Sequence, residues 1–455
     1  MEVTPIVACH LLAMPYPARG HINSLLNFCK LLVINNTHIL VTFVLTEEWL
    51  HFIGSDNPAP ANLRFTTISN VIPSELVRGA DQVTFMEAIM TNMEAPFEQL
   101  LDRLEPPPTI IVHDSLLFWV VGVGNRRNVT LALFWTMSAS IFSVLHHHHL
   151  LEQNSHYPVN FSENGDKRVD YIPGIPPSRL ADFPLNDESL RTRRLMELAR
   201  EGITWTPKAQ YLLFASVYEL EPQAIDVLKA DLSLPIYTIG PTIPCFDAGE
   251  KTKLNIDTTT ASHSYLQWLD NQPKNSVLYI SQGSHFSVAK GQVDEIASGL
   301  RECGVRFLWI ARREASRLKE ICGEKGLVVE WCEQLKVLRH PAIGGFWTHC
   351  GWNSIKEGIL TLPIMMDQGL DSAMIVEWWK VGWRVKDDVQ ANRVVKKDEV
   401  AGLLKKFIDM ESYEGREMRK RAKELQHTFR RAIADGGSGQ NDFNAFVRDI
   451  TNTAK

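Results

Sequence analysis

The sequence has few cysteines, and none of the spacings by which cysteines commonly hold a metal ion or a disulfide framework. Its seven cysteines, among 455 residues, form no C-x-x-C pair, and their number is odd. Such usage favours reduced thiols over a secreted, disulfide-bonded scaffold. The first residues, MEVTPIVACHLLAMPYP, carry an acid before a short apolar run that prolines interrupt, unlike a secretory signal peptide. We therefore expect a cytoplasmic protein.

No apolar run in the chain is long enough to span a bilayer, and no long run of basic residues occurs. The formal net charge is −6, and the most basic segment, REMRKRAKELQHTFRRA from Arg416, mixes acidic with basic residues as a solvated helix face does. We expect neither a transmembrane segment nor a nucleic-acid partner. With 45% hydrophobic residues, a chain of this length suits two or three globular domains, and we expect a monomer.

Motifs for several other ligand classes are missing as well. No G-x-x-x-x-G-K-[ST] loop occurs, and the G-x-G that begins at Gly122 has Arg127 where a dinucleotide-binding loop has its third glycine, so a nicotinamide-dependent oxidoreductase lacks its fingerprint. His349 and Cys350 have no second ligand pair at zinc spacing. The four histidines at 146–149 could bind a metal, but such a tract more often forms a surface or a helix turn. We expect no metal and no cofactor.

Short apolar runs alternate with amphipathic segments along the chain, which is the pattern of parallel strands joined by helices. Buried strands are predicted at 5–15, 38–46, 63–69, 109–115, 129–135 and 209–216, and again at 276–284, 306–312, 326–331 and 343–350. Between the two groups, residues 241–262 are rich in Pro, Gly, Thr and charge, as a linker is. We predict an α/β protein with two Rossmann-like, doubly wound domains at 1–240 and 263–435, and a C-terminal helix at 436–455 that packs back on the first domain.

A stretch late in the chain, GGFWTHCGWNSIKEGILTLPIMMDQ, places polar groups at the carboxyl end of a predicted strand, where such sheets bind ligands. Asn353 and Ser354 are good N-cap residues for a helix over 354–360. The free N–H groups of that helix, together with His349, would suit a diphosphate, and Glu357 could accept hydrogen bonds from ribose hydroxyls. On these residues alone, an ordinary capped helix beside a satisfied histidine fits equally well.

The longer stretch WCEQLKVLRHPAIGGFWTHCGWNSIKEGILTLPIMMDQ, residues 331–368, resembles the secondary-product glycosyltransferase box, the donor-site signature of plant family 1 UDP-dependent glycosyltransferases. The order W-x-x-Q, H-C-G-W-N-S-x-x-E and D-Q is long and specific. PYPARGHINS near the start and SQGS at 281–284 extend the similarity over essentially the whole chain. The resemblance implies a GT-B fold, in which the N-terminal domain binds an acceptor and the C-terminal domain binds UDP-sugar. It also implies transfer of the sugar with inversion and without a metal.

The resemblance assigns a role to each matched residue of the donor site. Trp331 would stack on uracil, and Gln334 would lie near the ribose, whose hydroxyls Glu357 would hold. The diphosphate would be bound by His349, Asn353, Ser354 and Ser284. The sugar would be contacted by Trp352, Asp367 and Gln368. A terminal Gln in this box is associated with glucose as the donor sugar.

His21, in RGHIN, matches the family's catalytic base, and Asp114, in VHDS, matches the carboxylate that orients it. A neutral imidazole can take the proton of an acceptor hydroxyl, and a buried aspartate fixes its tautomer and stabilises the imidazolium. The sequence alone does not pair two residues so far apart. Without the resemblance, His21 would be a residue at the start of a helix, and His113 would compete with it as the base.

The box departs from the family in one place. Between EGILT and LPIMMDQ six residues are missing, where the family has a Gly-Val/Ile-Pro turn that opens the next strand. Six extended residues cover about 20 Å, so a helix or a strand must be shorter, and Asp367 and Gln368 must be repositioned. The alternative to an active enzyme is therefore a catalytically impaired UDP-sugar-binding variant.

The expected acceptor is a small lipophilic molecule with a hydroxyl group, such as a flavonoid, another phenolic, a terpenoid or a hormone. Phe118, Trp119 and Trp135 could line its pocket as a flat apolar surface. The same residues are equally suited to the core of the domain, and the sequence leaves both alternatives open.

Overall fold

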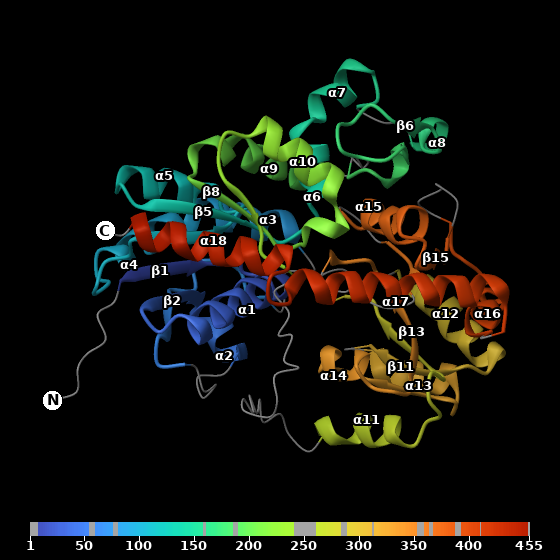
Figure 1. The fold of residues 1–455 in the computed structure, drawn as a ribbon. Coiled ribbons are helices and arrows are strands. Elements are labelled where there is room, and N and C mark those ends of the chain that lie inside the picture. Colours follow the sequence, from blue (N-terminus) through green and yellow to red (C-terminus); the bar gives the residue numbers. More distant parts are fainter. Residues whose placement is uncertain are drawn as a thin grey trace.

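The computed structural model describes residues 8–53, 60–75, 81–157, 161–184, 190–240, 261–283, 289–311, 314–352, 359–363, 367–386, 393–409 and 411–453. Their strands form one parallel sheet in each of two lobes (Figure 1). The N-terminal sheet has the order β3-β2-β1-β4-β5-β8-β9. Its strands are β1 (Cys9–Met14), β2 (Ile39–Thr46), β3 (Leu63–Ile68), β4 (Ile110–Asp114), β5 (Thr130–Trp135), β8 (Tyr211–Phe214) and β9 (Ile236–Thr238).

The C-terminal sheet has the order β12-β11-β10-β13-β14-β15. Its strands are β10 (Val277–Ser281), β11 (Arg306–Ile310), β12 (Gly326–Val329), β13 (Ile343–Thr348), β14 (Ile359–Thr361) and β15 (Gly382–Arg384). In each sheet the order reverses beside the first strand, between β1 and β4 and between β10 and β13. Such a reversal opens a ligand crevice at the carboxyl ends of the strands. The predicted doubly wound α/β class is confirmed, and each run predicted as a strand contains one.

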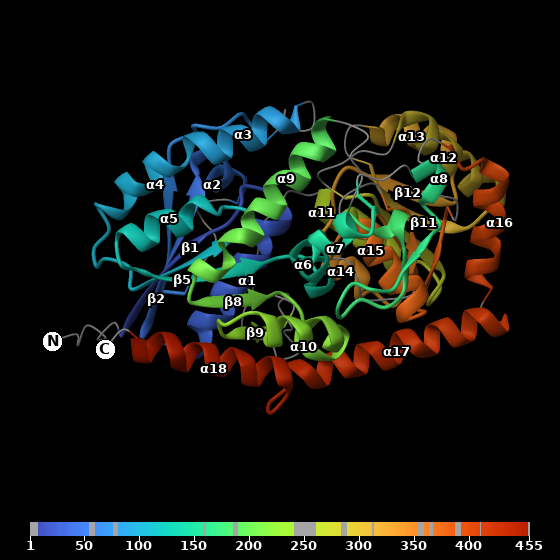
Figure 2. The ribbon, with the colours of Figure 1, turned by 90° about the horizontal axis from the view of Figure 1, so that it is seen from above.

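Helices cover both faces of each sheet (Figures 1 and 2). Those of the N-terminal lobe are α1 (Arg19–Asn35), α2 (Glu47–Ile53), α3 (Gln82–Asn92), α4 (Glu94–Leu101), α5 (Trp119–Arg126), α6 (Ala139–His146), α7 (His148–Gln153), α8 (Phe161–Asn164), α9 (Leu190–Trp205) and α10 (Pro222–Asp231), with 3₁₀ turns at Leu180–Asp182, Thr206–Lys208 and Tyr218–Leu220 and a small ribbon of β6 (Arg168–Val169) and β7 (Ser178–Arg179). Those that follow are α11 (Ala261–Asp270), α12 (Lys290–Cys303), α13 (Ala315–Cys322), α14 (Gln334–Leu338), α15 (Gln368–Ala373), a π-helical turn at Met374–Trp378, α16 (Lys397–Ile408), α17 (Tyr413–Ile433) and α18 (Ser438–Thr453). None of these described helices is both long and apolar enough to cross a membrane.

The alternation of side chains along each strand divides the N-terminal lobe into two core layers. In β1, Leu12 and Met14 pack on the face that α3 to α6 cover, whereas Leu11 and Ala13 pack on the face that α1 covers. Strands that are buried on both faces read as continuous apolar runs, which is why the sequence shows them so clearly.

The C-terminal helix packs against the N-terminal lobe, and α17 leads to it along one side of the molecule (Figure 2). Phe446 of α18 lies in the core layer of α1, with its ring centroid 6.0 Å from that of Phe28. The backbone N–H of Thr238 in β9 donates to Asp442 over 2.8 Å. The predicted linker at 241–262 lies outside the described residues except for its last two positions, which begin α11.

The two lobes contact each other through buried polar pairs. Arg384 at the end of β15 donates to both oxygens of Asp182 in the N-terminal lobe, over 2.8 and 3.0 Å, and both side chains are only 5% exposed. A Cβ on Gly369 in α15 would lie 2.7 Å from the carbonyl oxygen of Asp182, so this contact requires a glycine. The lobes are therefore fixed close together around the crevice.

Candidate active site

The predicted base and its carboxylate meet at the point where the strand order of the N-terminal sheet reverses. β1 and β4 are neighbours, with Met14 opposite His113, so the chain that leaves each strand enters the same crevice. His21 lies in the first turn of α1, and Asp114 is the last residue of β4. The Nδ1 atom of His21 is 2.6 Å from Oδ2 of Asp114. Strand order thus brings together two side chains that the sequence holds far apart.

The contact fixes the tautomer of His21. A carboxylate only accepts hydrogen bonds, so Nδ1 carries the proton and Nε2 presents its lone pair. Asp114 is 1% exposed, and its other oxygen accepts the backbone N–H of Leu116 over 3.0 Å, whereas the His21 side chain is 22% exposed. The arrangement is a buried, oriented carboxylate behind a solvent-accessible imidazole, which suits a general base.

Two further side chains, which sequence reasoning missed, lie beside His21. The hydroxyl of Thr136, just after β5, lies 3.1 Å from Nδ1, and the ring of Tyr16 lies 5.1 Å from the imidazole ring. Thr136 is 115 residues from His21, so only the position of β5 beside β4 could have indicated it.

His113, the competing candidate, is buried in the sheet. Its Nδ1 lies 3.0 Å from the carbonyl oxygen of Asp114, and the side chain is not exposed to solvent. Burial lowers its pKa to about 4. A fully buried imidazole cannot reach an acceptor, so the geometry favours His21 as the base.

The residues offered as acceptor lining all lie in the core. Phe118, Trp119 and Trp135 are buried in the layer under α3 to α6, and the indole N–H of Trp135 donates to the Ser138 carbonyl over 2.8 Å. Of the two alternatives that the sequence left open, the structure favours packing.

On the donor side, His349 follows β13 at the second crevice, where the strand order of the C-terminal sheet reverses. Its imidazole lies between two glycines: a Cβ on Gly283 would come within 2.6 Å of Nε2, and one on Gly351 within 2.8 Å. Burial lowers the pKa of His349 to about 4, against a smaller effect of a backbone hydrogen bond to Ser281, so the ring is neutral at physiological pH. Its buried Nδ1 has no hydrogen-bond partner among the described residues, and a buried polar atom without a partner costs free energy until a ligand satisfies it.

Trp331 and Gln334 flank the same edge of the C-terminal sheet. Trp331 follows β12 and is 39% exposed, so its ring is open to stacking. Gln334 is the first residue of α14, and its Oε1 accepts the hydroxyl of Tyr279 over 3.3 Å.

Four predicted donor residues lie outside the described part of the chain: Ser284, Asn353, Ser354 and Glu357. The helix predicted over 354–360 is wrong at its last two residues, because Ile359 and Leu360 belong to β14, opposite Phe346 and Trp347 of β13. With six residues fewer, the sheet takes its strand from the end of the predicted helix. The unpaired backbone groups of β13 and β15 would otherwise be left without partners, and that cost exceeds local helix preference.

The three predicted sugar contacts lie where the lobes meet. Trp352 donates its indole N–H to the Ala215 carbonyl of the N-terminal lobe over 2.8 Å, so that donor is already used. Gln368, the first residue of α15, is buried, and Asp367 precedes it. Burial raises the pKa of Asp367, whereas attraction to His21 lowers it, which places this carboxyl within electrostatic reach of the base.

Asp371, one turn further along α15, was also missed. Burial and then repulsion from Asp367 raise its pKa well above the ordinary value, so it holds a proton that it can donate to Asp367. Ser138, which begins α6, donates to Asp371 over 3.1 Å and so joins the lobes beside the site.

A cavity of about 550 Å³ also opens between the lobes, but not in front of the base. Arg168, Glu219, Glu377 and Trp379 are among its lining residues, whereas His21 and Asp114 are not. This cavity lies where the two lobes contact each other, apart from the catalytic pair.

Comparisons with known proteins agree with this geometry. Residues 241–422 match the family described as UDP-glucoronosyl and UDP-glucosyl transferase. The chain is 47% identical over 446 residues to UDP-glycosyltransferase 87A1 of Arabidopsis thaliana, covering 96% of this chain and 99% of that protein. Its fold is similar to that of Medicago truncatula UGT71G1 complexed with UDP-glucose (TM-score 0.77, 26% identity, 97% and 98% of the two chains). It is also similar to that of Phytolacca americana UGT2 complexed with UDP-2fluoro-glucose and pterostilbene (TM-score 0.78, 23% identity, 99% and 100%).

The matches extend over nearly the whole chain and both lobes. The chain therefore belongs to the plant family 1 UDP-glycosyltransferases, enzymes of the GT-B fold that use UDP-sugar as the donor.

Proposed function

We propose that this chain transfers glucose from UDP-glucose, with inversion, to a hydroxyl group of a small lipophilic acceptor. The observation that carries the proposal is the 2.6 Å contact between His21 and Asp114, which leaves a basic Nε2 open at the crevice between the lobes. Membership of the family supplies the donor class, and the Gln that ends the box supports glucose.

In the proposed mechanism, Nε2 of His21 takes the proton of the acceptor hydroxyl as its oxygen attacks the anomeric carbon. Asp114 stabilises the imidazolium that forms. The attack comes from the face opposite the leaving UDP, so the centre inverts. Neutral His349 donates a hydrogen bond to the diphosphate as negative charge builds on it.

On the donor side, Trp331 stacks on uracil, and Gln334 and Glu357 hold the ribose. Ser284, Asn353 and Ser354 complete the diphosphate site. Asp367 and Gln368 orient the sugar, helped by Trp352. We propose that no metal or cofactor takes part and that the enzyme acts as a cytoplasmic monomer. Chelation with EDTA should then leave the rate unchanged.

The base assignment is tested with His21→Ala and Asp114→Asn, and with His38→Ala as the control because His38 is an exposed histidine outside the site. We expect the first two variants to lose about 10²–10⁴-fold in kcat, the contribution typical of general base catalysis. Calorimetry should show UDP binding unchanged in all three. Transfer by His21→Ala at the wild-type rate would overturn the proposal.

A second candidate, a UDP-sugar binder with impaired turnover, is favoured by one observation. Only residues 349–358 connect Thr348 of β13 to Ile359 of β14, fewer than the dozen or more of an ordinary helical crossover. This connection contains Asn353, Ser354 and Glu357, and Asp367 and Gln368 follow it. Fewer residues are therefore left to position these donor-binding side chains than the family provides. Tight UDP binding by calorimetry, with neither hydrolysis nor transfer of UDP-glucose, would select this candidate.

The acceptor class is proposed from the family and from one neighbour of the fold, whose complex contains pterostilbene. We expect phenolic acceptors to react first in a panel of flavonoids, stilbenes, terpenoids and hormones supplied with UDP-glucose. Product formed only with terpenoids would move the assignment to that class.

A further inference from the structure

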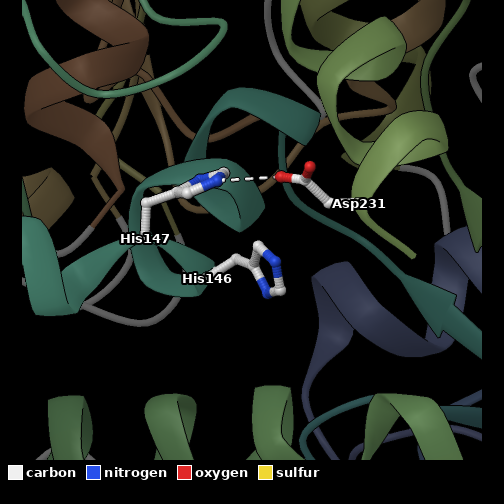
Figure 3. Close-up of side chains that lie close together, drawn as sticks. All are labelled: His146, His147 and Asp231. Carbon is white, nitrogen blue, oxygen red and sulfur yellow. Dashed lines mark hydrogen bonds and ion pairs between the residues drawn. The ribbon is translucent and has the colours of Figure 1, made fainter.

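A cluster of metal-ligating side chains lies in the N-terminal lobe, apart from the catalytic pair. His146 ends α6, His147 follows it, and Asp231 ends α10, so the cluster joins the ends of two helices (Figure 3). The three candidate ligand atoms all lie within 4.8 Å of one another. We propose that His146, His147 and Asp231 bind a divalent transition-metal ion, with Zn²⁺ as the best chemical fit.

The hydrogen bonds of His147 point to a ligand. Its Nδ1 lies 2.9 Å from the Ser143 carbonyl oxygen, and a carbonyl only accepts, so Nδ1 carries the proton. Nε2 therefore faces Oδ2 of Asp231, 3.0 Å away, and a proton or a cation must lie between these two atoms. A histidine held by a backbone carbonyl at one nitrogen while the other binds a metal is the usual second-shell arrangement of metal sites.

His146 supplies the third ligand because the helix ends there. Successive residues of a regular helix point about 100° apart. Here α6 stops at His146 and α7 starts at His148, and the backbone turn at His147 leaves the two imidazole centroids 4.8 Å apart.

The distances and ligand types suit zinc. Zinc ligands lie about 2.0–2.2 Å from the ion, which places tetrahedral neighbours roughly 3.4 Å apart. The ligand atoms of His147 and Asp231 are already 3.0 Å apart. A side-chain rotation of His146 would bring its ring nitrogen, now within 4.8 Å of both, to the distance that zinc requires. Two imidazoles and a carboxylate are borderline ligands that Zn²⁺ prefers and that Mg²⁺ and Ca²⁺ do not. Asp231 is 40% exposed, which leaves the fourth position to water.

The bound ion would be structural. It would tie the end of α6 to the end of α10, while the other end of α6, about 12 Å away, carries Ser138 and its bond to Asp371. Sequence composition alone favoured an ordinary helix turn for this tract. The convergence with Asp231 is a property of the fold.

The test uses the full chain without a polyhistidine tag, treated with EDTA, freed of chelator and titrated with ZnCl₂ in a calorimeter. Wild type should bind one Zn²⁺ per chain, and Co²⁺ should give the intense visible absorption of a tetrahedral site. Asp231→Asn and His146→Ala should each weaken Zn²⁺ binding by about tenfold or more. His149→Ala is the matched control, because His149 belongs to the same tract but is exposed, and it should bind as wild type does.

The proposal is overturned if wild type binds no stoichiometric Zn²⁺, or if His149→Ala weakens binding as much as Asp231→Asn. UDP binding, measured on each variant, verifies that the chain is folded, and Asp231→Asn changes only a half-exposed helix end. UDP binding should not change with Zn²⁺, so the outcome is independent of the proposed transferase activity.

Discussion

Single side chains at this site differ in function because they differ in exposure. His21 and His113 both lie next to Asp114, one through its carboxylate and the other through its backbone. Only His21 is accessible to solvent, so only His21 can exchange a proton with a substrate. His113 instead contributes to the pH dependence of stability.

We predict that His113 makes the protein less stable in acid. Burial lowers its pKa to about 4 from the ordinary 6.5, so between these values the unfolded chain binds a proton that the folded chain does not. The free energy of unfolding therefore falls as the pH drops through this window, by about 2 kcal/mol from pH 7 to pH 5 for this one group. Urea denaturation at both pH values should show that this part of the loss is absent in His113→Gln. An equal loss in both proteins would contradict the assignment.

We predict that Gly283→Ala weakens UDP binding through His349. The new Cβ would lie 2.6 Å from Nε2 of that ring, and Gly283 has φ +81°. Displacing the ring costs about 1–3 kcal/mol, or about 5- to 150-fold in Kd. Gly304→Ala is the control, because Gly304 has φ +67° and nothing within 4 Å of a Cβ. Both variants place an alanine in the left-handed region, so they carry the same backbone strain. UDP binding measured by calorimetry should therefore weaken only in Gly283→Ala. Equal Kd values in the two variants would rule out the clash with His349.

Among the secondary-structure elements, β14 shows how the fold responds to the shortened box. It has only three residues, and both β13 and β15 pair with it in parallel. The sheet keeps its strand order. The missing residues instead shorten the connection at 349–358, which contains the predicted diphosphate-binding residues. Gln368 then begins α15 against the N-terminal lobe, and Asp367 precedes it.

We predict that lengthening this region raises turnover. Inserting after Thr361 six residues with the Gly-Val/Ile-Pro turn of the family box would let Ile359 and Leu360 return to a helix. A displacement of about 1 Å in a substrate-positioning group can cost 10²-fold, so transfer from UDP-glucose should rise about tenfold or more. A Gly/Ser insert of equal length is the control and should not restore it. Unchanged turnover with the natural insert would show that the short connection does not impair the enzyme.

The molecule as a whole is a pair of lobes, held together by buried polar contacts and by the C-terminal helices α17 and α18. Asp182 with Arg384 and Ala215 with Trp352 join the lobes from within, and α17 and α18 cross both lobes on the outside (Figure 2).

We predict that Arg384→Met loosens the contact between the lobes. It removes two hydrogen bonds to the buried Asp182, which keeps Arg179 as its other bidentate partner, so we expect a loss of about 1.5–3 kcal/mol. The melting temperature should fall by several degrees. Arg126→Met is the control, because its ion pair with Glu94 is solvent-exposed, and it should leave the melting temperature unchanged. The same melting temperature in Arg384→Met and wild type would show that this pair does not hold the lobes.

Sequence reasoning succeeded where a pattern is local. Long apolar strands such as β1 and β2, buried on both faces, were predictable from their composition. The three-residue strands β9, β14 and β15 were not, because three residues show no period. The helical segment 82–101 divides into α3 and α4 at Met93, since Pro96 cannot donate to the preceding turn.

The order of amino acids was enough to fix the α/β class, the division between two groups of strands and the donor motif, because periodicity and motif spacing involve neighbours along the chain. The folded arrangement was needed to choose His21 over His113, to place Thr136 and Asp371 at the site, and to bring Asp231 to His146 and His147. Each of those pairings depends on which strands and helix ends become neighbours in space. That arrangement is a collective outcome of packing the sheets and their helices, so no short stretch of sequence contains it.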